Sequence, residues 1–271
     1  MKIALGQMQI YWENKRANLE KAEIYLKLSA ERGTELFLLP EMSLTGFSMH
    51  TAKTKESKSK KETIAQIQRL AEKYHTAIGV GWVKDAGALC ENHYSIVTPE
   101  GRILDYAKLH PFRFAKETEY FRGGDSLPVL EYKGFQIGVQ ICYDLRFPEP
   151  FQILSKRADL IVVPANWPAV RSEHWKCLLK ARAIENMVYV AGVNCAGEME
   201  GVFYSGDSGI YAPDGTALKT ELIRLPGACR EEQTQICELE NDVSKRRERF
   251  PVKEDRREDL YRKLQKETQE L

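Results

Sequence analysis

Apolar residues along this chain follow two spacings. Short apolar or alternating runs, such as Lys2 to Met8, predict buried strands. Longer stretches with an apolar residue every three or four positions, such as Asn14 to Arg32, predict amphipathic helices. Because the two kinds of segment follow one another along most of the sequence, we expect an α/β fold in which mixed sheets are covered by helices. The predicted strands span residues 2–8, 35–42, 76–83, 93–101, 102–108, 134–142, 159–167, 188–194, 206–218 (two strands around a Pro-Asp-Gly turn) and 234–240, and the further helices span 63–74, 149–156 and 172–186.

Nothing in the sequence divides the chain into separate parts. The 271 residues contain no linker, low-complexity tract or internal repeat, so we expect one domain over residues 1–271. From about residue 244 to 271, acidic and basic residues interleave, which predicts a solvated C-terminal tail. A similar charge run over 53–62 predicts a solvated loop. The tail also carries apolar residues that could anchor it to a partner, namely Phe250, Pro251, Val252, Leu260 and Tyr261.

The charge balance limits the classes of partner. The chain has 40 Lys plus Arg against 39 Asp plus Glu, so no net field attracts nucleic acid or an anionic membrane, and a small-molecule ligand fits better. No window approaches the ~18 apolar residues that span a bilayer, and the first residues lack the pattern of a signal peptide. The six cysteines form no CxxC pair, which predicts a reduced, cytoplasmic chain.

A cysteine at the end of a predicted strand is the first candidate for chemistry. Cys142 closes the apolar run 134–142 and is followed at once by "YDLRFPEP". A lone cysteine in such a run is usually a small buried hydrophobe. The sharp turn, however, predicts a thiol at the carboxyl edge of a sheet, where the backbone N–H of Tyr143 can face the same space. A nucleophilic thiol needs a base, and none of the five histidines lies in the sequence context of a cysteine-protease dyad.

Two further predicted strands end on charged residues. Glu41 closes the run 35–42, and Lys108 closes the run 102–108. Taken singly, each is typical of a surface charge at the end of a strand. Together with Cys142 they provide what acyl transfer requires: a carboxylate to accept the thiol proton, a sulfur to attack a carbonyl, and an ammonium to stabilise the oxyanion.

Three stretches that contain these residues resemble a known family. "LFLLPEMSLTGF", "YAKLHPF" and "GVQICYDLRFPE" are similar, in that order, to the signature stretches of the nitrilase superfamily of carbon-nitrogen hydrolases. The similarity continues through "PANWP", "ARAIEN", "GDSGIYAPDG" and "DRREDLY", so it covers nearly the whole chain. The resemblance implies an αββα sandwich, with Glu41 as base, Lys108 as oxyanion-stabilising cation and Cys142 as nucleophile. It also implies a second glutamate, for which Glu117 is the best match and Glu119 the alternative.

Within this superfamily the chain looks most like the ω-amidase branch, through "PANWPAVRSEHWKCLLKARAIEN". That likeness implies hydrolysis of small α-keto acid amides such as 2-oxoglutaramate and 2-oxosuccinamate, to the acid and ammonia. The chain departs from the branch where Pro111 follows His110, which implies a differently shaped loop beside the pocket. The resemblance implies no cofactor, and the sequence has no HxxEH, HExxH or paired Cys/His spacing that predicts a metal site.

Four more residues are candidates for contact with the substrate. Asn166 and Trp167 follow a predicted strand and should lie near the cleft, although Trp167 fits core packing equally well. Arg146 and Arg171 could bind a substrate carboxylate through a bidentate fork. Each arginine also has a possible structural partner nearby, in Glu149 and Glu173.

Other functions remain open at this point. An N-carbamoyl amine hydrolase or a nitrilase would use the same three residues. A non-catalytic binding or scaffold protein could instead carry Cys142 as a redox-sensitive thiol. The resemblance further implies a homodimer or higher homo-oligomer that pairs through a helical face, with the C-terminal tail reaching the neighbouring subunit.

Overall fold

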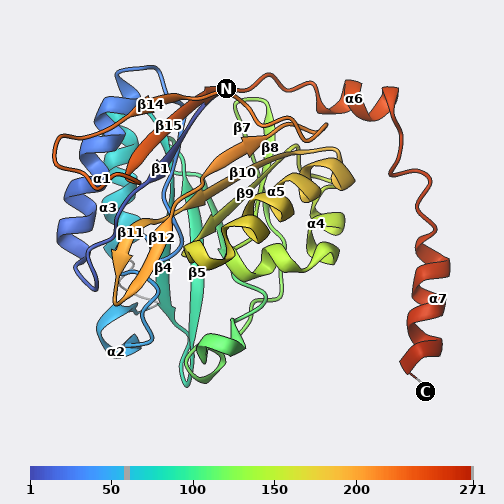
Figure 1. The fold of residues 1–271 in the computed structure, drawn as a ribbon, viewed down its shortest axis with the longest axis horizontal. Helices are drawn as coiled ribbons and strands as arrows, with labels where there is room; N and C mark the ends of the chain where they lie inside the picture. Colours follow the sequence, from blue (N-terminus) through green and yellow to red (C-terminus); the bar gives the residue numbers. More distant parts are fainter. Residues whose placement is uncertain (58–61, 270–271) are drawn as a thin grey trace.

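The computed structural model describes residues 1–57 and 62–269. Two large sheets form within these residues, and they face each other across a shared core (Figure 1). In spatial order, the strands of the first sheet are β14 (Glu221–Ile223), β15 (Gln233–Glu238), β1 (Lys2–Gln7), β2 (Leu36–Leu38), β4 (Ala77–Asp85), β5 (Cys90–Val97) and β6 (Ile103–Ala107), with the short β3 (Lys55–Glu56) beside β4. The strands of the second sheet are β13 (Gly209–Tyr211), β10 (Tyr189–Asn194), β9 (Leu160–Ala165), β8 (Phe135–Val139) and β7 (Val129–Tyr132).

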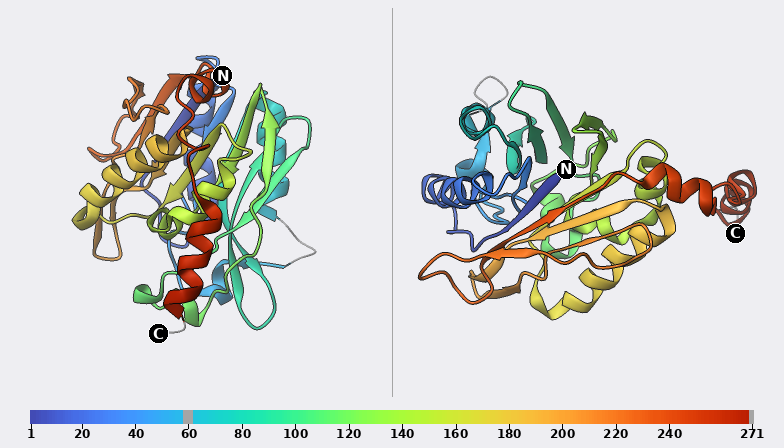
Figure 2. Two further views of the ribbon diagram at one scale, coloured as in Figure 1. Left: turned by 90° about the vertical axis from the view of Figure 1, so that its right-hand side faces the viewer. Right: turned by 90° about the horizontal axis from the view of Figure 1, so that it is seen from above.

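Helices cover the outer face of each sheet. α1 (Lys15–Ala30) and α3 (Glu62–Tyr74) lie on the first sheet, and α4 (Pro148–Leu154) and α5 (Ser172–Asn186) lie on the second, as the right panel of Figure 2 shows. The resulting layers are helix, sheet, sheet and helix, which is the predicted αββα sandwich. No helix within the described residues is long and apolar enough to cross a membrane.

The alternation of side chains along the strands separates an inner core, between the two sheets, from the outer cores beneath the helices. In β1, Ile3 and Leu5 face the second sheet, whereas Ala4 faces α1. In β9, Val162 faces the inner core and Ile161 faces the outer helices. Apolar side chains point outward from both faces of these strands, so each sheet is buried on both sides. This accounts for the nearly continuous apolar runs in the sequence.

Several predicted strands are shorter than expected. β8 ends at Val139, and Cys142 instead begins a 3₁₀ turn over Cys142–Arg146 with a positive φ of 46°. After the Pro-Asp-Gly turn, the expected second strand reduces to a single bridge between Tyr211 and Ala217. Residues 53–62 were expected to form a solvated loop, but the first of them belong to α2 (Thr51–Thr54) and β3. Residues 58–61 lie outside the described residues.

The C-terminal tail forms two helices that the sequence pattern did not predict, α6 (Val243–Arg249) and α7 (Glu258–Gln269). Arg247 Nη2 donates to the backbone oxygens of Ser155 and Ala158, at 3.0 Å each, which ties α6 to the end of α4. α7 lies at the side of the molecule, apart from the sheets (Figure 1). Lys253, Arg256 and Glu258 also contact Ser155, Gln152 and Lys156, so the tail is anchored at the end of α4 as far as the start of α7.

Candidate active site

Loops from both sheets bring the candidate residues together. Glu41 lies three residues beyond β2, and Lys108 directly follows β6, both in the first sheet. Cys142 lies three residues beyond β8 in the second sheet. The site therefore forms between the two sheets, at the ends of strands that are distant in sequence.

A glycine permits the position of Glu41. A Cβ on Gly81 of β4 would lie only 2.8 Å from the carbonyl carbon of Glu41, so a larger residue could not pack there. The backbone N–H of Ser43 donates to Gly81 O at 3.1 Å, and Ser43 Oγ accepts from Gly81 N at 2.9 Å. The Glu41 loop thus lies directly on β4.

Glu41, Lys108 and Glu117 form a buried network of ion pairs. Lys108 Nζ lies 2.9 Å from Glu41 Oε1 and 2.9 Å from Glu117 Oε2. All three residues are at most 1% exposed. Burial alone would lower the pKa of Lys108, but the charges of Glu117 and Glu41 outweigh it and hold that pKa above its ordinary value. Lys108 therefore stays positively charged in the folded protein.

The structure selects Glu117 over Glu119 as the neighbour of Lys108. Glu117 is fully buried, whereas Glu119 is exposed to solvent. Glu117 also accepts a hydrogen bond from the backbone N–H of Phe112, which closes the loop around it. Burial raises the pKa of the Glu117 carboxyl, and the charge of Lys108 opposes that rise.

The turn at Cys142 is held by Asp144, whose role sequence reasoning missed. Its buried carboxylate accepts from the backbone N–H of Ile141 at 2.9 Å and from Tyr106 Oη at 2.8 Å. It also accepts from the backbone N–H of His110 at 2.9 Å. One side chain thus links the turn of the second sheet to the loop that carries Lys108. The positive φ of Cys142, unusual for a residue other than glycine, is stabilised by these bonds.

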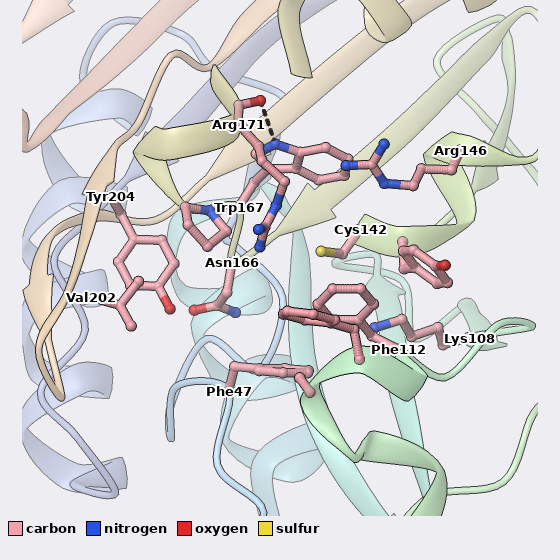
Figure 3. Close-up of a pocket in the computed structure, with 14 residues that line it drawn as sticks. Phe47, Lys108, Phe112, Cys142, Arg146, Asn166, Trp167, Arg171, Val202 and Tyr204 are labelled. Atoms are coloured by element: carbon pink, nitrogen blue, oxygen red, sulfur yellow. Dashed lines mark hydrogen bonds between the residues drawn. The ribbon is translucent and has the colours of Figure 1, made fainter. Parts of the chain in front are cut away.

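The thiol of Cys142 is protonated at rest. Burial raises its pKa well above the ordinary value, the carboxylate of Glu41 raises it further, and Lys108 opposes the rise. Figure 3 shows the sulfur on the wall of a pocket, with Lys108 and Phe112 nearby. Nucleophilic attack by this sulfur therefore requires a base that removes the proton.

Six aromatic side chains and two arginines are among the residues that line the pocket. Pro111 departs from the expected motif, and the loop that follows it brings Phe112 into the pocket. Tyr143 also lines the pocket and packs against Phe112 with ring centroids 4.6 Å apart. Phe114 lines the pocket too. The other lining residues include Phe47, Arg146, Asn166, Trp167, Arg171, Val202 and Tyr204 (Figure 3).

Both arginines stack on aromatic rings. Arg146 Cζ lies 4.9 Å from the centroid of the Trp167 ring, and Arg171 Cζ lies 5.9 Å from that of Phe112. Within the described residues, neither arginine forms an ion pair with an acidic side chain, so the alternative pairings with Glu149 and Glu173 are wrong. Glu173 instead pairs with Lys176. Two guanidinium groups thus line the pocket without a carboxylate partner.

Asn166 and Trp167 serve both the core and the pocket. The backbone N–H of Asn166 donates to Glu41 Oε2 at 2.9 Å, and its Nδ2 donates to Glu41 O at 2.7 Å. Trp167 is only 3% exposed, and its Nε1 donates to Arg171 O at 2.8 Å (Figure 3). Asn194 Oδ1 in turn accepts from the backbone N–H of Trp167 at 2.7 Å.

Asn92 is a second residue of the site that the sequence pattern did not identify. It lies in β5 on the same face as Tyr94 and Ile96, and its Nδ2 donates to both Glu41 Oε1 and Glu117 Oε1, at 2.8 and 3.1 Å. A polar residue on an otherwise apolar strand face was the signal that could have found it.

Within the described part of the chain, no three His, Cys, Asp or Glu side chains are grouped so that they could hold a metal ion.

The layered fold and a pocket that holds a cysteine beside buried acidic and basic groups are typical of hydrolases that use a thiol. The chain belongs to the carbon-nitrogen hydrolase family, whose model matches residues 2–225. It is therefore a hydrolase of carbon-nitrogen bonds other than peptide bonds, and the predicted likeness to the nitrilase superfamily is confirmed.

Relatives and a solved structure agree with this assignment. A protein of Yersinia enterocolitica named omega-amidase YafV is 34% identical over 253 residues, which cover 93% of this chain and 95% of the relative. A 2-oxoglutaramate amidase of Bacillus subtilis is 30% identical over 264 residues, or 96% of this chain and 98% of the relative. The crystal structure of XC1258 from Xanthomonas campestris, a CN-hydrolase superfamily protein with an arsenic adduct in its active site, has a TM-score of 0.79 and 29% identity, covering 94% of this chain and 97% of that one.

Proposed function

We propose that this hydrolase is an ω-amidase, which removes the terminal amide group of short α-keto acid amides such as 2-oxoglutaramate and 2-oxosuccinamate. The observation that carries the substrate class is the pair Arg146 and Arg171, which line the pocket beside Cys142 without an acidic partner among the described residues. Relatives named omega-amidase and 2-oxoglutaramate amidase support the same class.

The arginines supply the cation that such a substrate needs. An α-keto acid amide has a carboxylate at one end and the scissile amide at the other. Lys108 is not free to bind the carboxylate, because two of the N–H groups of its ammonium donate to Glu41 and Glu117 and the remaining one serves the oxyanion. A guanidinium group can bind a carboxylate through two parallel hydrogen bonds, and the aromatic rings beneath both arginines hold those groups in place.

The reaction that we propose forms a thioester and then hydrolyses it. Glu41 takes the proton of Cys142 as the sulfur adds to the amide carbonyl. Lys108 and the backbone N–H of Tyr143 stabilise the negative charge on the carbonyl oxygen. The protonated Glu41 then gives its proton to the amide nitrogen, the C–N bond breaks and ammonia leaves. Glu41 next takes a proton from water as the resulting hydroxide attacks the thioester. The C–S bond then breaks, the acid leaves, and Glu41 returns its proton to the sulfur, which restores the thiol.

Glu117 has a supporting role in this mechanism. Its carboxylate keeps Lys108 charged and holds its ammonium beside Glu41, since both carboxylates accept from the same Nζ atom. A buried ammonium with two carboxylates keeps its proton throughout the cycle, and its charge is then available to the oxyanion. No step of the proposed cycle uses a cofactor or a metal ion.

A substrate panel tests the function. Release of ammonia is measured for 2-oxoglutaramate, 2-oxosuccinamate, an amide of the same length without the carboxylate, an N-carbamoyl amine and a nitrile. We expect kcat/KM for the keto acid amides to exceed that for the uncharged amide at least tenfold. A better rate with the uncharged amide, the carbamoyl compound or the nitrile would contradict the ω-amidase assignment. Absence of any turnover would favour the binding or scaffold alternative.

We further propose a homo-oligomer, most simply a two-fold dimer, in a reducing compartment such as the cytoplasm. Exposed apolar side chains lie on the outer helices and on the tail, for example Ile153 of α4 at 54%, Ile184 of α5 at 43% and Phe250 at 62%. A cysteine nucleophile needs a reducing environment, because oxidation of Cys142 would block the attack. Light scattering that reports a monomer of about 31 kDa at micromolar concentration would contradict the oligomer.

A further inference from the structure

Asn92 connects the two carboxylates of the site. It is 1% exposed, and its single Nδ2 atom donates to Glu41 Oε1 at 2.8 Å and to Glu117 Oε1 at 3.1 Å. Because ionised carboxylates accept hydrogen bonds and cannot donate them, the amide nitrogen must face this pair. The oxygen of the same amide, Oδ1, is buried without a partner among the described residues. A neutral residue thus uses both of its N–H groups on the candidate active site.

The backbone of Asn92 also contacts the site. The backbone N–H of Lys108 donates to Asn92 O at 2.9 Å, so β5 fixes the residue that carries the ammonium. Side chain and backbone of one residue therefore reach Glu41, Glu117 and Lys108. On the opposite face of β5, His93 pairs with Glu91 and Asp105, at 2.9 and 2.8 Å, in a separate cluster.

The charge balance of the site explains why neutral donors are needed. With both carboxylates ionised and Lys108 protonated, the buried group carries one negative charge more than it has positive charges. Hydrogen bonds from neutral donors favour the ionised form of a buried carboxylate. Backbone N–H groups provide one such bond to each carboxylate, from Asn166 to Glu41 and from Phe112 to Glu117. Asn92 provides one to each from a single side chain.

We propose that Asn92 is a positioning residue that holds Glu41 and Glu117 as one unit and keeps both carboxylates ionised, so that Glu41 can accept the proton of Cys142. The inference rests on the proposed roles of Glu41 and Cys142 and is independent of the substrate. Removal of the two N–H groups makes protonation of the pair easier. The base is then lost at a higher pH than in the unchanged protein.

Other titratable groups also act on this pair. Lys108 and Cys142 contact it directly or through short-range charge interactions, and Cys195 and Tyr204 lie within reach of the charge of Glu41. The substitution Asn92→Ala changes none of these charges. A shift of the pH profile in that variant would thus report the loss of hydrogen bonds to the carboxylates.

The test measures how fast iodoacetamide alkylates Cys142 as a function of pH, followed by mass spectrometry of the Cys142 peptide. We expect Asn92→Ala to move the acidic limb of this profile to higher pH by about one unit, a tenfold change in proton affinity, which is the scale of a hydrogen bond to a charged group. Asn92→Ser, which keeps one donor, should shift the limb less. Where an amide substrate is turned over, kcat/KM should show the same shift.

Asn194→Ala is the matched control. Asn194 is a buried asparagine that also makes several hydrogen bonds beside the pocket, to Trp167 and Gly206, but it donates to neither carboxylate. Its loss should lower activity or melting temperature and leave the acidic limb within 0.3 unit, roughly the error of such a profile. An unshifted limb in Asn92→Ala, or an equal shift in the control, would overturn the proposal. If Asn92→Ala does not fold, the acidic limb of Asn92→Ser is compared with that of Asn194→Ala instead, and the same outcomes support or overturn the proposal. Because alkylation uses no amide substrate, its outcome is separate from that of the ω-amidase assignment.

Discussion

The two sides of the pocket differ in how their charges are satisfied. On the inner side, Lys108 donates to two carboxylates, and Asn92 donates to the same two. On the outer side, Arg146 and Arg171 rest on aromatic rings and have no acidic partner among the described residues. A buried network in which one ammonium is held by two carboxylates keeps its geometry, whereas a cation without an acidic partner at a pocket wall can bind an anion. Under the proposed mechanism, bond cleavage takes place on the inner side and the substrate carboxylate binds on the outer side.

The largest effect should follow removal of the sulfur on which the two sides converge. Cys142→Ala should abolish ammonia release, because no other side chain in the pocket can form the thioester. The fold should survive, since replacing a thiol by a methyl group leaves only a small void. Activity assays and circular dichroism check this, with the exposed Cys177→Ala as the control. Activity within tenfold of the unchanged protein would exclude the thioester route.

Loss of the ammonium on the inner side should come next. Lys108→Ala should lower kcat/KM at least a hundredfold, about 2.7 to 4 kcal/mol, which is typical for removal of one oxyanion donor. The variant should also unfold at a lower temperature, because it leaves two buried carboxylates without their cation. Kinetics and thermal unfolding are measured beside Lys27→Ala, whose lysine is exposed on α1. A rate loss below tenfold would make Lys108 structural.

A substitution on the outer side should have a smaller and more selective effect. Arg146→Ala or Arg171→Ala should raise KM for a keto acid amide, because a substrate carboxylate loses its partner. The lower kcat/KM should correspond to a loss of about 2 kcal/mol of transition-state stabilisation. We expect the low end of the usual range, since both arginines are only half-buried. The rate with an amide that lacks the carboxylate should hardly change. Equal losses for both substrates, or the same loss in the exposed Arg69→Ala, would remove the distinction between the two sides.

The smallest expected effect concerns the order in which the thiols react. At pH 7, brief treatment with iodoacetamide should label Cys142 ahead of the exposed Cys177 by a modest factor. Burial and Glu41 raise the pKa of Cys142, so few thiolates exist at rest, and its advantage depends on proton transfer to Glu41. Peptide mapping of the labelled protein measures the order. Labelling of Cys177 first, with activity retained, would indicate that Glu41 does not act as the base.

The sequence by itself determined the α/β class of the fold and the main candidates of the inner side, whereas the αββα layers were implied by the resemblance to a family. Its alternating and helical periods are local properties, and they predicted β1, β9, α1 and α5 close to their observed bounds. Glu41, Lys108 and Cys142 could be found because each follows a strand, where side chains from distant segments meet. The resemblance to a family then implied a role for each of them, as base, oxyanion-stabilising cation and nucleophile.

Only the tertiary structure decided the partners of these residues. Glu117 and Glu119 lie two positions apart, and nothing local shows that one is buried against Lys108 while the other is exposed. The side chains of Asn92 and Asp144 act mainly through hydrogen bonds to residues 25 or more positions away, such as Glu117, Glu41 and Tyr106. The bond of Asp144 to Ile141 is the local exception. Such contacts depend on how the two sheets pack, because a hydrogen bond needs its donor and acceptor within about 3 Å and at a suitable angle. The spacing of residues along the chain carries no information at that precision.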